Sequence, residues 1–540
     1  MFTDVILMAK KIIKNEKKAE GVVGGSLRDG GIITCKAKVI DIEAGARAVV
    51  LNEDQAKAEG IYLGNRVRLK SEGKESIAIV DVSDHMVKPG EILMFADSAK
   101  QMNVKNGDNV NIWFAHRPSS IDYIKKKMDG KPLNESEIKT IISELMDNKL
   151  SEVELACFIT SVYVRGLSPE ETVSLTNAIC NSGETLDLGK KPVVDKHCSG
   201  GVAGNRTTML LVPIIAAAGL YIPKTSSRAI TSAAGTADTM EVLAPVNFDI
   251  DEMRETVLKT HGCMVWGGGV SLAPADDKLI RIRYPLSLDP REALIASILA
   301  KKKSVGAEYV VIDIPTGRGS KHEDTVAAQG LAQEFLEIGA KLGMKIEVLI
   351  TDGSDPIGNG IGPGLECRDV LWALSGDPRG PADLIDKSCQ LAGVLLELCG
   401  KVDKGKGYSA AKLLLENGKA YKKMLEIIDA QGGNPKVKID DLPIGQYKYE
   451  VKADKDGRIS HADNKILSKI ARAAGAPKSP GAGVYLHAEK GDKVKKGDVL
   501  FEIISDTEGK LDFAIKSLES LEPIELQKVI IGKIGGNNQV

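Results

Sequence analysis

The stretch Val194-Asp-Lys-His-Cys-Ser-Gly-Gly-Val-Ala-Gly-Asn-Arg-Thr-Thr208 decides the fold. It contains the end of a strand, a glycine-rich turn with hydroxyl side chains, and the start of an apolar helix. Glycines let the backbone approach an anion closely, and N–H groups at a helix N-terminus point toward it. Lys196 adds a full positive charge. The stretch predicts an anion-binding loop in an α/β domain, with an ordinary glycine-rich turn as the alternative.

On either side of this loop, apolar strand runs alternate with helical stretches over residues 189–450. The strand runs are Pro192–Asp195, Tyr309–Ile314 and Ile346–Thr351, and the helical stretches lie near Thr207–Ala218, Pro290–Lys303 and Glu323–Leu342. This alternation is typical of a parallel or mixed sheet whose strands are joined by helices. We predict a large α/β domain with a mixed sheet over 189–450, in a chain with several domains.

A helical domain is predicted over residues 118–188. Three helix starts of the capping-box kind follow one another there, at Asn134 with Glu137, Ser151 with Glu154, and Ser168 with Glu171. Between the first two, apolar residues recur at helical spacing and form one face.

The N-terminal region, 1–117, is rich in β-branched runs and contains a weak internal repeat. Asp54-Gln-Ala-Lys, Ile61 and Gly64-Asn-Arg-Val-Arg-Leu69 recur 43 residues later as Asp97-Ser-Ala-Lys, Val104 and Gly107-Asp-Asn-Val-Asn-Ile112. Two such half-units closing on each other predict a β-barrel-like domain, with chance similarity as the alternative. Residues 1–30 are interpreted as a mobile leader or an upstream start, and no function is assigned to them. The last region, 451–540, is predicted to be an α+β domain.

Composition excludes several classes of function. The formal net charge of −2 gives no general affinity for nucleic acid or an anionic membrane. No apolar run approaches the roughly 18 residues that span a bilayer. The eight cysteines form no C-x-x-C pair and have no histidine at metal-ligand spacing. We expect a cytoplasmic protein without a metal, a nucleic-acid partner or a membrane partner.

A second stretch strengthens the anion-binding hypothesis. In Lys224-Thr-Ser-Ser-Arg-Ala-Ile-Thr-Ser-Ala-Ala-Gly-Thr-Ala-Asp-Thr-Met-Glu241, five hydroxyl residues and Arg228 lie within nine positions. A solvated loop can have this content. Arginine with several hydroxyls and close backbone is also how phosphate and ribose groups are held. Two separate cradles suit a phosphorylated substrate together with inorganic phosphate.

Both stretches resemble motifs of one family. The string S-S-R-A-I-T-S-A-A-G-T-A-D-x-x-E is similar to the signature of the thymidine/pyrimidine-nucleoside phosphorylase superfamily, and K-H-x-x-G-G-V-x-G is similar to its phosphate loop. The likeness runs from about residue 120 to the C-terminus. The S-S-R-A-I-T-S form and the extra N-terminal domain resemble the archaeal-type AMP phosphorylase branch.

The resemblance implies roles for particular residues. Phosphate is expected at Lys196, Thr208, Ser226 and Thr236, and AMP at Gly201, Ser227, Arg228, Ala229, Ile230, Thr231, Ser232, Thr236, Ser297 and Lys321. Cys198 stands where the superfamily usually has Ser. A thiol is a weak donor, so the sequence leaves open whether Cys198 contacts phosphate.

The resemblance also makes Asp289 the general acid and gives His197 a catalytic role. Each has a structural alternative. Asp289 precedes Pro290 at a helix start, which is typical of an N-cap. A capping carboxylate accepts amide hydrogen bonds that lower its pKa, which is the wrong direction for an acid acting near neutral pH. His197 can instead be a hydrogen-bonded core histidine.

Three further residues are candidates for substrate binding. Lys301 begins a run of three lysines, which is usually a solvated helix face, but Ser297 lies one turn earlier and can face the same cleft. Arg283 keeps a base contact of the pyrimidine branch, whereas the tyrosine expected three residues earlier is Ile280. A uracil or thymine site without half its contacts is a poor one, so AMP is favoured.

The resemblance therefore implies phosphorolysis of AMP, and of other nucleoside monophosphates to an extent left open, with phosphate as co-substrate and no cofactor. We expect a homodimer or a larger homo-oligomer. One alternative is a pyrimidine nucleoside phosphorylase. A second is an anthranilate-type phosphoribosyltransferase, for which Asp276-Asp277 is the only nearby pair of Mg²⁺ carboxylates. A third is a nucleotide sensor without turnover.

Overall fold

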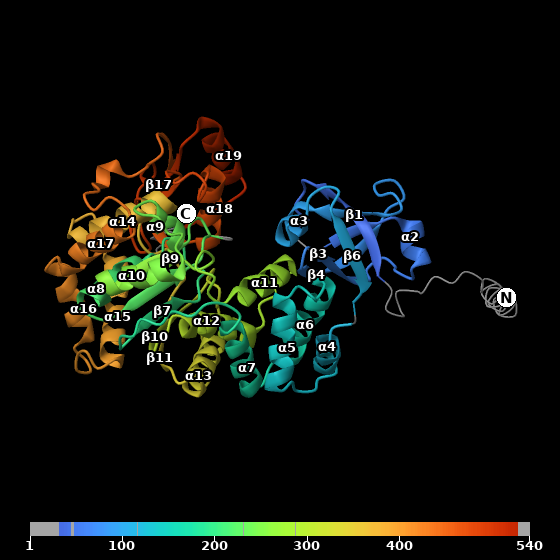
Figure 1. Ribbon diagram of the computed structural model, residues 1–540. Coiled ribbons are helices and arrows are strands. Elements are labelled where there is room, and N and C mark those ends of the chain that lie inside the picture. The colour runs from blue at the N-terminus through green and yellow to red at the C-terminus, as the bar shows by residue number, and fades with distance from the viewer. Residues whose placement is uncertain (1–31, 45–47, 116, 230–231, 287, 528–540) are drawn as a thin grey trace, which may run out of the picture. The chain divides into compact units, whose positions relative to one another are not determined.

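The computed structural model describes residues 32–44, 48–115, 117–229, 232–286 and 288–527 (Figure 1). The leader predicted over residues 1–30 lies outside this part. The chain divides into two compact units, 1–126 with 143–158 and 127–142 with 159–540. The domain limits that we placed at residues 117, 188 and 450 stay predictions.

The N-terminal strands form a closed barrel in the order β1-β5-β2-β4-β3-β6. Its elements are β1 (Ile33–Ile40), β2 (Ala48–Leu51), α2 (Glu53–Ala58), β3 (Arg66–Ser71), β4 (Lys74–Val82), β5 (Glu91–Phe95), α3 (Ala96–Met102) and β6 (Asn109–Phe114). The internal repeat is real, because β2-α2-β3 and β5-α3-β6 are the same strand–helix–strand unit. Ile61 and Val104 occupy matching buried positions.

The predicted helix starts are confirmed. The helices are α4 (Ser120–Met128), α5 (Glu135–Met146), α6 (Glu152–Arg165) and α7 (Pro169–Cys180). Ser168 and Glu171 form a reciprocal capping box at α7. Glu171 also binds the ammonium of Lys127 at 2.7 Å, and both side chains are buried.

The α/β part is built on five strands, β7 (Val194–Cys198), β8 (Ile222–Ser226), β9 (Gly262–Trp266), β10 (Tyr309–Thr316) and β11 (Lys345–Asp352). β11, β10 and β7 pair in parallel, as do β8 and β9. A parallel bridge between Val193 and Tyr221 joins the two groups. The mixed sheet that we predicted is therefore wrong for these strands. Each is followed by a helix that returns the chain to the same edge, which makes neighbours parallel.

Helices cover both faces of this sheet (Figure 1). One core is closed by α8 (Thr207–Ala217), α14 (Pro363–Ser375), α15 (Ala382–Leu398), α16 (Gly407–Glu416) and α17 (Lys419–Ala430). The other is closed by α10 (Ile250–Thr260), α12 (Arg291–Ser304) and α13 (Thr325–Lys341). Two short helices, α9 (Thr236–Glu241) and α11 (Pro274–Arg283), follow β8 and β9. All helical stretches predicted here are confirmed.

The C-terminal part combines antiparallel strands with two helices. Its elements are β13 (Tyr447–Lys452), β14 (Gly457–Ala462), α18 (Asn464–Ala474), β15 (Gly483–Leu486), β16 (Lys493–Val494), β17 (Val499–Ser505), α19 (Glu508–Leu518) and β18 (Ile524–Gln527). A short strand of the α/β part, β12 (Gly360–Ile361), extends the sheet β15-β17-β13. The two parts therefore share backbone hydrogen bonds.

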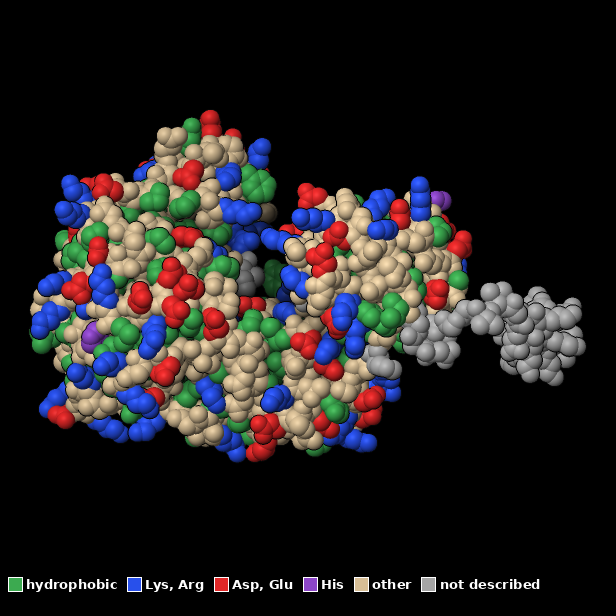
Figure 2. Space-filling view, viewed as in Figure 1, with side chains coloured by type: hydrophobic (Ala, Val, Ile, Leu, Met, Phe, Trp, Pro, Cys, Tyr) green, Lys and Arg blue, Asp and Glu red, His purple; other side chains and the backbone are tan. Residues whose placement is uncertain are grey.

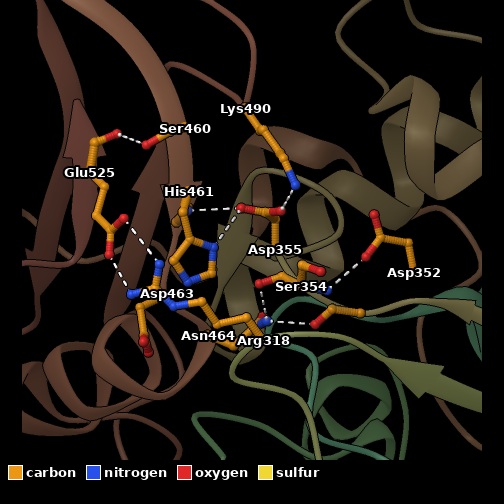
Figure 3. Close-up of polar contacts among 12 residues, drawn as sticks. Arg318, Asp352, Ser354, Asp355, Ser460, His461, Asp463, Asn464, Lys490 and Glu525 are labelled. Atoms are coloured by element: carbon orange, nitrogen blue, oxygen red, sulfur yellow. Dashed lines mark hydrogen bonds and ion pairs between the residues drawn. The ribbon is translucent and has the colours of Figure 1, made fainter. Parts of the chain in front are cut away.

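Side chains also fasten the C-terminal part to the loop after β11 (Figure 3). The carboxylate of Asp355 accepts hydrogen bonds from the backbone N–H of Ala462 at 2.8 Å and from Lys490 at 2.8 Å, and lies 3.1 Å from Nδ1 of His461. The side-chain amide of Asn464 donates to the carbonyl groups of Gly353 and Ser354. The side-chain oxygen of Asn464 also accepts a hydrogen bond from the N–H of Ala203 at 2.8 Å, which places the start of α18 beside the glycine-rich loop that follows β7.

On the face drawn in Figure 2, the described residues form no broad patch of one charge. Basic and acidic side chains are interspersed over the face drawn in Figure 2, as the net charge of −2 predicts. Within the described residues, no helix combines the length and the apolar character that crossing a bilayer requires.

Candidate functional site

A pocket of about 660 Å³ opens at the carboxyl ends of β7, β8 and β9. Eleven of the predicted site residues line it, namely Lys196, His197, Gly201, Thr208, Ser226, Ser227, Arg228, Ala229, Ser232, Thr236 and Lys301. The two predicted anion loops thus face one cavity, although they come from different strands. In parallel α/β sheets this edge is where ligands bind.

The first loop is held close to its neighbours by glycine. Gly201 has a φ of +94°, and a Cβ there would lie 2.5 Å from the backbone nitrogen of Lys321. The loop then enters α8, with Thr208 in the first turn. Its Ala203 N–H donates to the side-chain oxygen of Asn464 at 2.8 Å, so the C-terminal part supports this loop.

Positive charge dominates the pocket. Six lysine and arginine residues line it, against one carboxylate among the described residues: Lys196, Arg206, Lys224, Arg228, Lys301 and Lys302, against Asp277. Burial lowers the pKa of Lys196. Burial and neighbouring lysines lower the pKa of Lys224 to about 7. Charging all these groups is unfavourable, and a dianionic ligand offsets that cost.

A buried carboxylate anchors two of these lysines. Asp195 on β7 is fully buried and lies 2.5 Å from the ammonium of Lys302 and 3.8 Å from that of Lys224. Lys302 is 2% exposed, so the lysine run on α12 is not the solvated face that its sequence resembles. Lys224 and Lys302 were not among the predicted site residues.

Replacing Lys224 by Met should weaken phosphate binding in a pH-dependent way. The side chain of Lys224 is cationic below about pH 7 and neutral above it, so its attraction for phosphate is present at low pH and is lost as pH rises. At pH 6 the variant should bind phosphate about tenfold more weakly than the wild type. This ratio corresponds to about 1.4 kcal/mol of binding free energy. Calorimetric titrations with phosphate between pH 6 and 8.5 measure this ratio.

Phosphate itself changes charge in the same pH range, but it does so equally for both proteins. The ratio of the phosphate dissociation constants of the variant and the wild type therefore isolates the contribution of Lys224. It should approach one at the upper end of the range, and a ratio that stays constant with pH contradicts the prediction.

Two carboxylates from the second loop's own sequence motif, Asp238 and Glu241, bind other groups of this loop. Asp238 accepts hydrogen bonds from the N–H groups of Ala229 and Gly235 at 2.7 and 2.8 Å. A Cβ on Gly235 would lie 2.4 Å from the carbonyl oxygen of Ser227, so only glycine fits. Glu241 holds the guanidinium of Arg228 and raises its pKa. The charge of Arg228 is thus largely compensated. The predicted residues Ile230 and Thr231 lie outside the described part.

Arg206 connects the two loops. Its Nε donates to Glu366 at 2.5 Å, one terminal nitrogen donates to the hydroxyl of Thr236 at 3.0 Å, and the other donates to the carbonyl of Ala234 at 2.9 Å. Because the Thr236 oxygen accepts this bond, its own hydrogen is free to be donated to an anion in the pocket.

Asp289 does not cap α12, so that structural alternative is wrong. The N-cap is Pro290, which makes no side-chain cap bond. Asp289 instead lies 3.1 Å from Arg283 and 2.5 Å from the ammonium of Lys321. The backbone of Lys321 is the group that packs on Gly201. The structure therefore groups Asp289, Arg283 and Lys321 with one another, next to the residues that line the pocket.

His197 and Cys198 both lie at the end of β7 and line the pocket. Burial and the charges of Lys302, Lys224, Lys196 and Lys301 lower the pKa of His197 well below its usual value. The imidazole is therefore neutral at neutral pH and can donate a hydrogen bond, but it is a poor source of a proton. Burial raises the pKa of Cys198, which stays a thiol.

Ser297 and Lys301 meet at one carboxylate. Oδ2 of Asp276 accepts from the hydroxyl of Ser297 at 2.7 Å and lies 2.6 Å from the ammonium of Lys301. Ser297 is buried behind the lining, whereas Lys301 and Ile280 reach the pocket. Among the described residues, no group of three or more His, Cys, Asp or Glu side chains could hold a metal ion.

Comparison with protein families gives three matches along the chain. Residues 121–183 match the helical bundle domain of a glycosyl transferase family, and residues 190–288 match the a/b domain of a glycosyl transferase family. Residues 458–525 match the pyrimidine nucleoside phosphorylase C-terminal domain.

Full-length relatives extend the likeness. The chain is 45% identical to an AMP phosphorylase of Pyrococcus furiosus over 92% of its own length and 98% of the relative's. It is 44% identical to an AMP phosphorylase of Thermococcus kodakarensis, over 93% and 99%. An AMP phosphorylase of Methanosarcina barkeri is 45% identical, over 93% and 98%.

One solved structure shares the fold of part of the chain. Anthranilate phosphoribosyltransferase from Thermus thermophilus superposes with a TM-score of 0.50 at 20% identity. The match covers 58% of this chain and 100% of that one. At this identity the likeness concerns the fold alone.

Proposed function

The chain belongs to the AMP phosphorylase family, and we propose that it catalyses the phosphorolysis of AMP to adenine and ribose 1,5-bisphosphate. One observation carries the proposal beyond the family. Two anion-binding loops, one from residues after β7 and one from residues after β8, line the same cationic pocket. A nucleotide and inorganic phosphate together need two such loops.

In the proposed reaction, an oxygen of phosphate attacks C1′ on the face opposite the base. The bond from C1′ to the base nitrogen breaks with inversion. The attacking hydrogen phosphate gives up a proton, and Asp289 passes this proton to the nitrogen of the leaving base. Lys196, Thr208 and Thr236 hold the attacking phosphate in line and shield its charge. Phosphate is the co-substrate, and the proposal requires no cofactor.

The pyrimidine nucleoside alternative is not favoured. Ile280 lines the pocket where that branch has a base-binding tyrosine. An isoleucine offers no hydrogen bond to the carbonyl groups of uracil or thymine. The phosphoribosyltransferase alternative is weakened because Asp276 is engaged by Lys301 and Ser297. A cytoplasmic location and a homodimer or larger homo-oligomer complete the proposal.

One assay tests the substrate and the reaction class together. AMP, CMP, UMP, adenosine, uridine and thymidine are each offered with and without phosphate, and free base is measured. Phosphate-dependent release of adenine from AMP, with none from adenosine, is the expected result. Release of thymine from thymidine would establish the pyrimidine alternative instead. Binding of AMP without release of base would point to a sensor.

A further inference from the structure

The side chain of Asn464, at the start of α18, joins three separate segments of the chain. It belongs to the C-terminal part and is 2% exposed. Its oxygen accepts a hydrogen bond from the backbone N–H of Ala203 at 2.8 Å. Its nitrogen donates to the carbonyl groups of Gly353 at 3.0 Å and Ser354 at 3.1 Å (Figure 3). One buried amide therefore ties α18 to the loop after β7 and to the loop after β11.

This amide does not cap its own helix. Asp463, one residue earlier, is the N-cap of α18 and accepts from the N–H groups of Lys465 and Ile466. An asparagine amide has two donor hydrogens, and here a separate carbonyl group accepts each of them. Only one orientation of the amide fits, because an N–H faces its oxygen and two carbonyl groups face its nitrogen. The side chain of Asn464 therefore serves the two loops and not the helix.

The point that Asn464 holds directly follows the part of the first loop (residues 199–206) that lines the pocket. Residues 200–202 line the pocket, whereas Ala203 is buried. The N–H of Ala203 donates to Asn464, and its carbonyl group accepts from the N–H of Ile357 at 3.1 Å. Both backbone polar groups of Ala203 are thus held by segments that lie outside the first loop.

Close packing of the same two loops adds to this restraint. A Cβ on Gly204 would lie 2.4 Å from the carbonyl oxygen of Ile357, and one on Gly353 would lie 3.1 Å from a methyl group of Val202. Asp355 in turn fastens the loop after β11 to the C-terminal part. A loop that must become ordered when its ligand binds loses affinity, so a loop held in place beforehand binds more tightly.

We propose that Asn464 is a positioning residue for the phosphate co-substrate: it holds the first loop in the conformation that binds phosphate. This inference rests on the proposed function, in which phosphate binds at this loop. It gives the C-terminal part a role in phosphate binding, although none of the described residues after 450 lines the pocket.

The experiment compares Asn464→Ala with the wild type in the full-length chain. Inorganic phosphate and AMP are titrated separately by calorimetry, and the thermal midpoint is measured. Alanine leaves the N–H of Ala203 without its acceptor, so phosphate affinity should fall about tenfold or more. AMP affinity should fall clearly less, because the second loop supplies most of the contacts predicted for AMP. An unchanged phosphate affinity, or equal losses for the two ligands, would overturn the proposal.

A matched control removes the cap of the same helix. Asp463→Ala deletes the side chain that caps α18 and leaves the three hydrogen bonds of Asn464 in place. This variant should have a lower thermal midpoint and an unchanged phosphate affinity. If it loses as much phosphate affinity as Asn464→Ala, then Asn464 acts only through the stability of the C-terminal part, and the proposal is wrong.

Hydrogen exchange of the first loop tests the route of the effect. Amides in peptides that cover residues 199–206 should exchange faster in Asn464→Ala than in the wild type, because the N–H of Ala203 loses its acceptor. Asp463→Ala should leave this exchange unchanged. Weaker phosphate binding without faster exchange would contradict a route through the loop. All these measurements are made without turnover, so wild-type protein that binds phosphate but releases no adenine from AMP contradicts the proposed function and not this inference.

Discussion

Replacing Asp289 by Asn is expected to lower kcat for AMP phosphorolysis about 10²–10⁴-fold, the usual contribution of a general acid. Asparagine has the size and shape of aspartate but no proton to give to the leaving base. It also keeps an oxygen that can accept from Arg283 and Lys321, the two groups that hold Asp289. Phosphate affinity should therefore be unchanged. Initial rates of adenine release and phosphate titrations measure the two effects.

A second substrate separates proton donation from positioning. This substrate is ribose 5-phosphate with a 4-nitrophenoxy group at C1′. It releases 4-nitrophenolate, which is a stable anion and departs without taking up a proton. The Asp289→Asn variant should turn over this compound almost as fast as the wild type. If both substrates lose rate equally, Asp289 serves to position Lys321 and is not the acid. Glu292→Gln, which changes another carboxylate at the start of α12, is the control and should have little effect.

The sequence predicted those parts of the fold that local patterns specify. A capping box involves residues three positions apart, so Ser168 with Glu171 could be recognised without knowing the fold. The repeat in the barrel is likewise a linear pattern. Strand direction is different, because an apolar run such as Tyr309–Ile314 does not say which strand it will pair with. The alternation of strands with helices left a parallel or a mixed sheet open, and the choice of a mixed sheet was wrong for β7 to β11.

The two loops of the pocket were predicted because each is a continuous motif. What the sequence could not show is how distant residues complete them. Arg206 meets Glu366 160 positions away, and Lys302 meets Asp195 107 positions away. Lys302 in particular has the sequence context of a surface lysine. The local sequence around Asp289 likewise misleads. It is typical of a helix N-cap, but the side chain forms ion pairs with Arg283 and Lys321 instead.

Arg206 offers the largest expected effect on stability. Its partner Glu366 is 1% exposed and also accepts from the hydroxyl of Thr239 at 2.9 Å and the N–H of Gly362 at 3.2 Å. Replacing Arg206 by Met leaves this carboxylate buried without a cation, which should lower the free energy of unfolding by about 3–5 kcal/mol. Denaturant unfolding measures the loss.

The double variant Arg206→Met with Glu366→Gln separates that stability effect from function. Glutamine removes the unpaired charge and keeps an oxygen for Thr239, so the free energy of unfolding should largely recover. We expect Arg206→Met to lower phosphate affinity, and this affinity should stay low in the double variant. In both variants the Thr236 oxygen no longer accepts a hydrogen bond from Arg206, so nothing directs the hydroxyl hydrogen of Thr236 toward the anion. Arg318→Met, which breaks the exposed pair with Glu525 shown in Figure 3, should change neither quantity much. Recovery of phosphate affinity together with stability would mean that Arg206 supports the fold and not the orientation of Thr236.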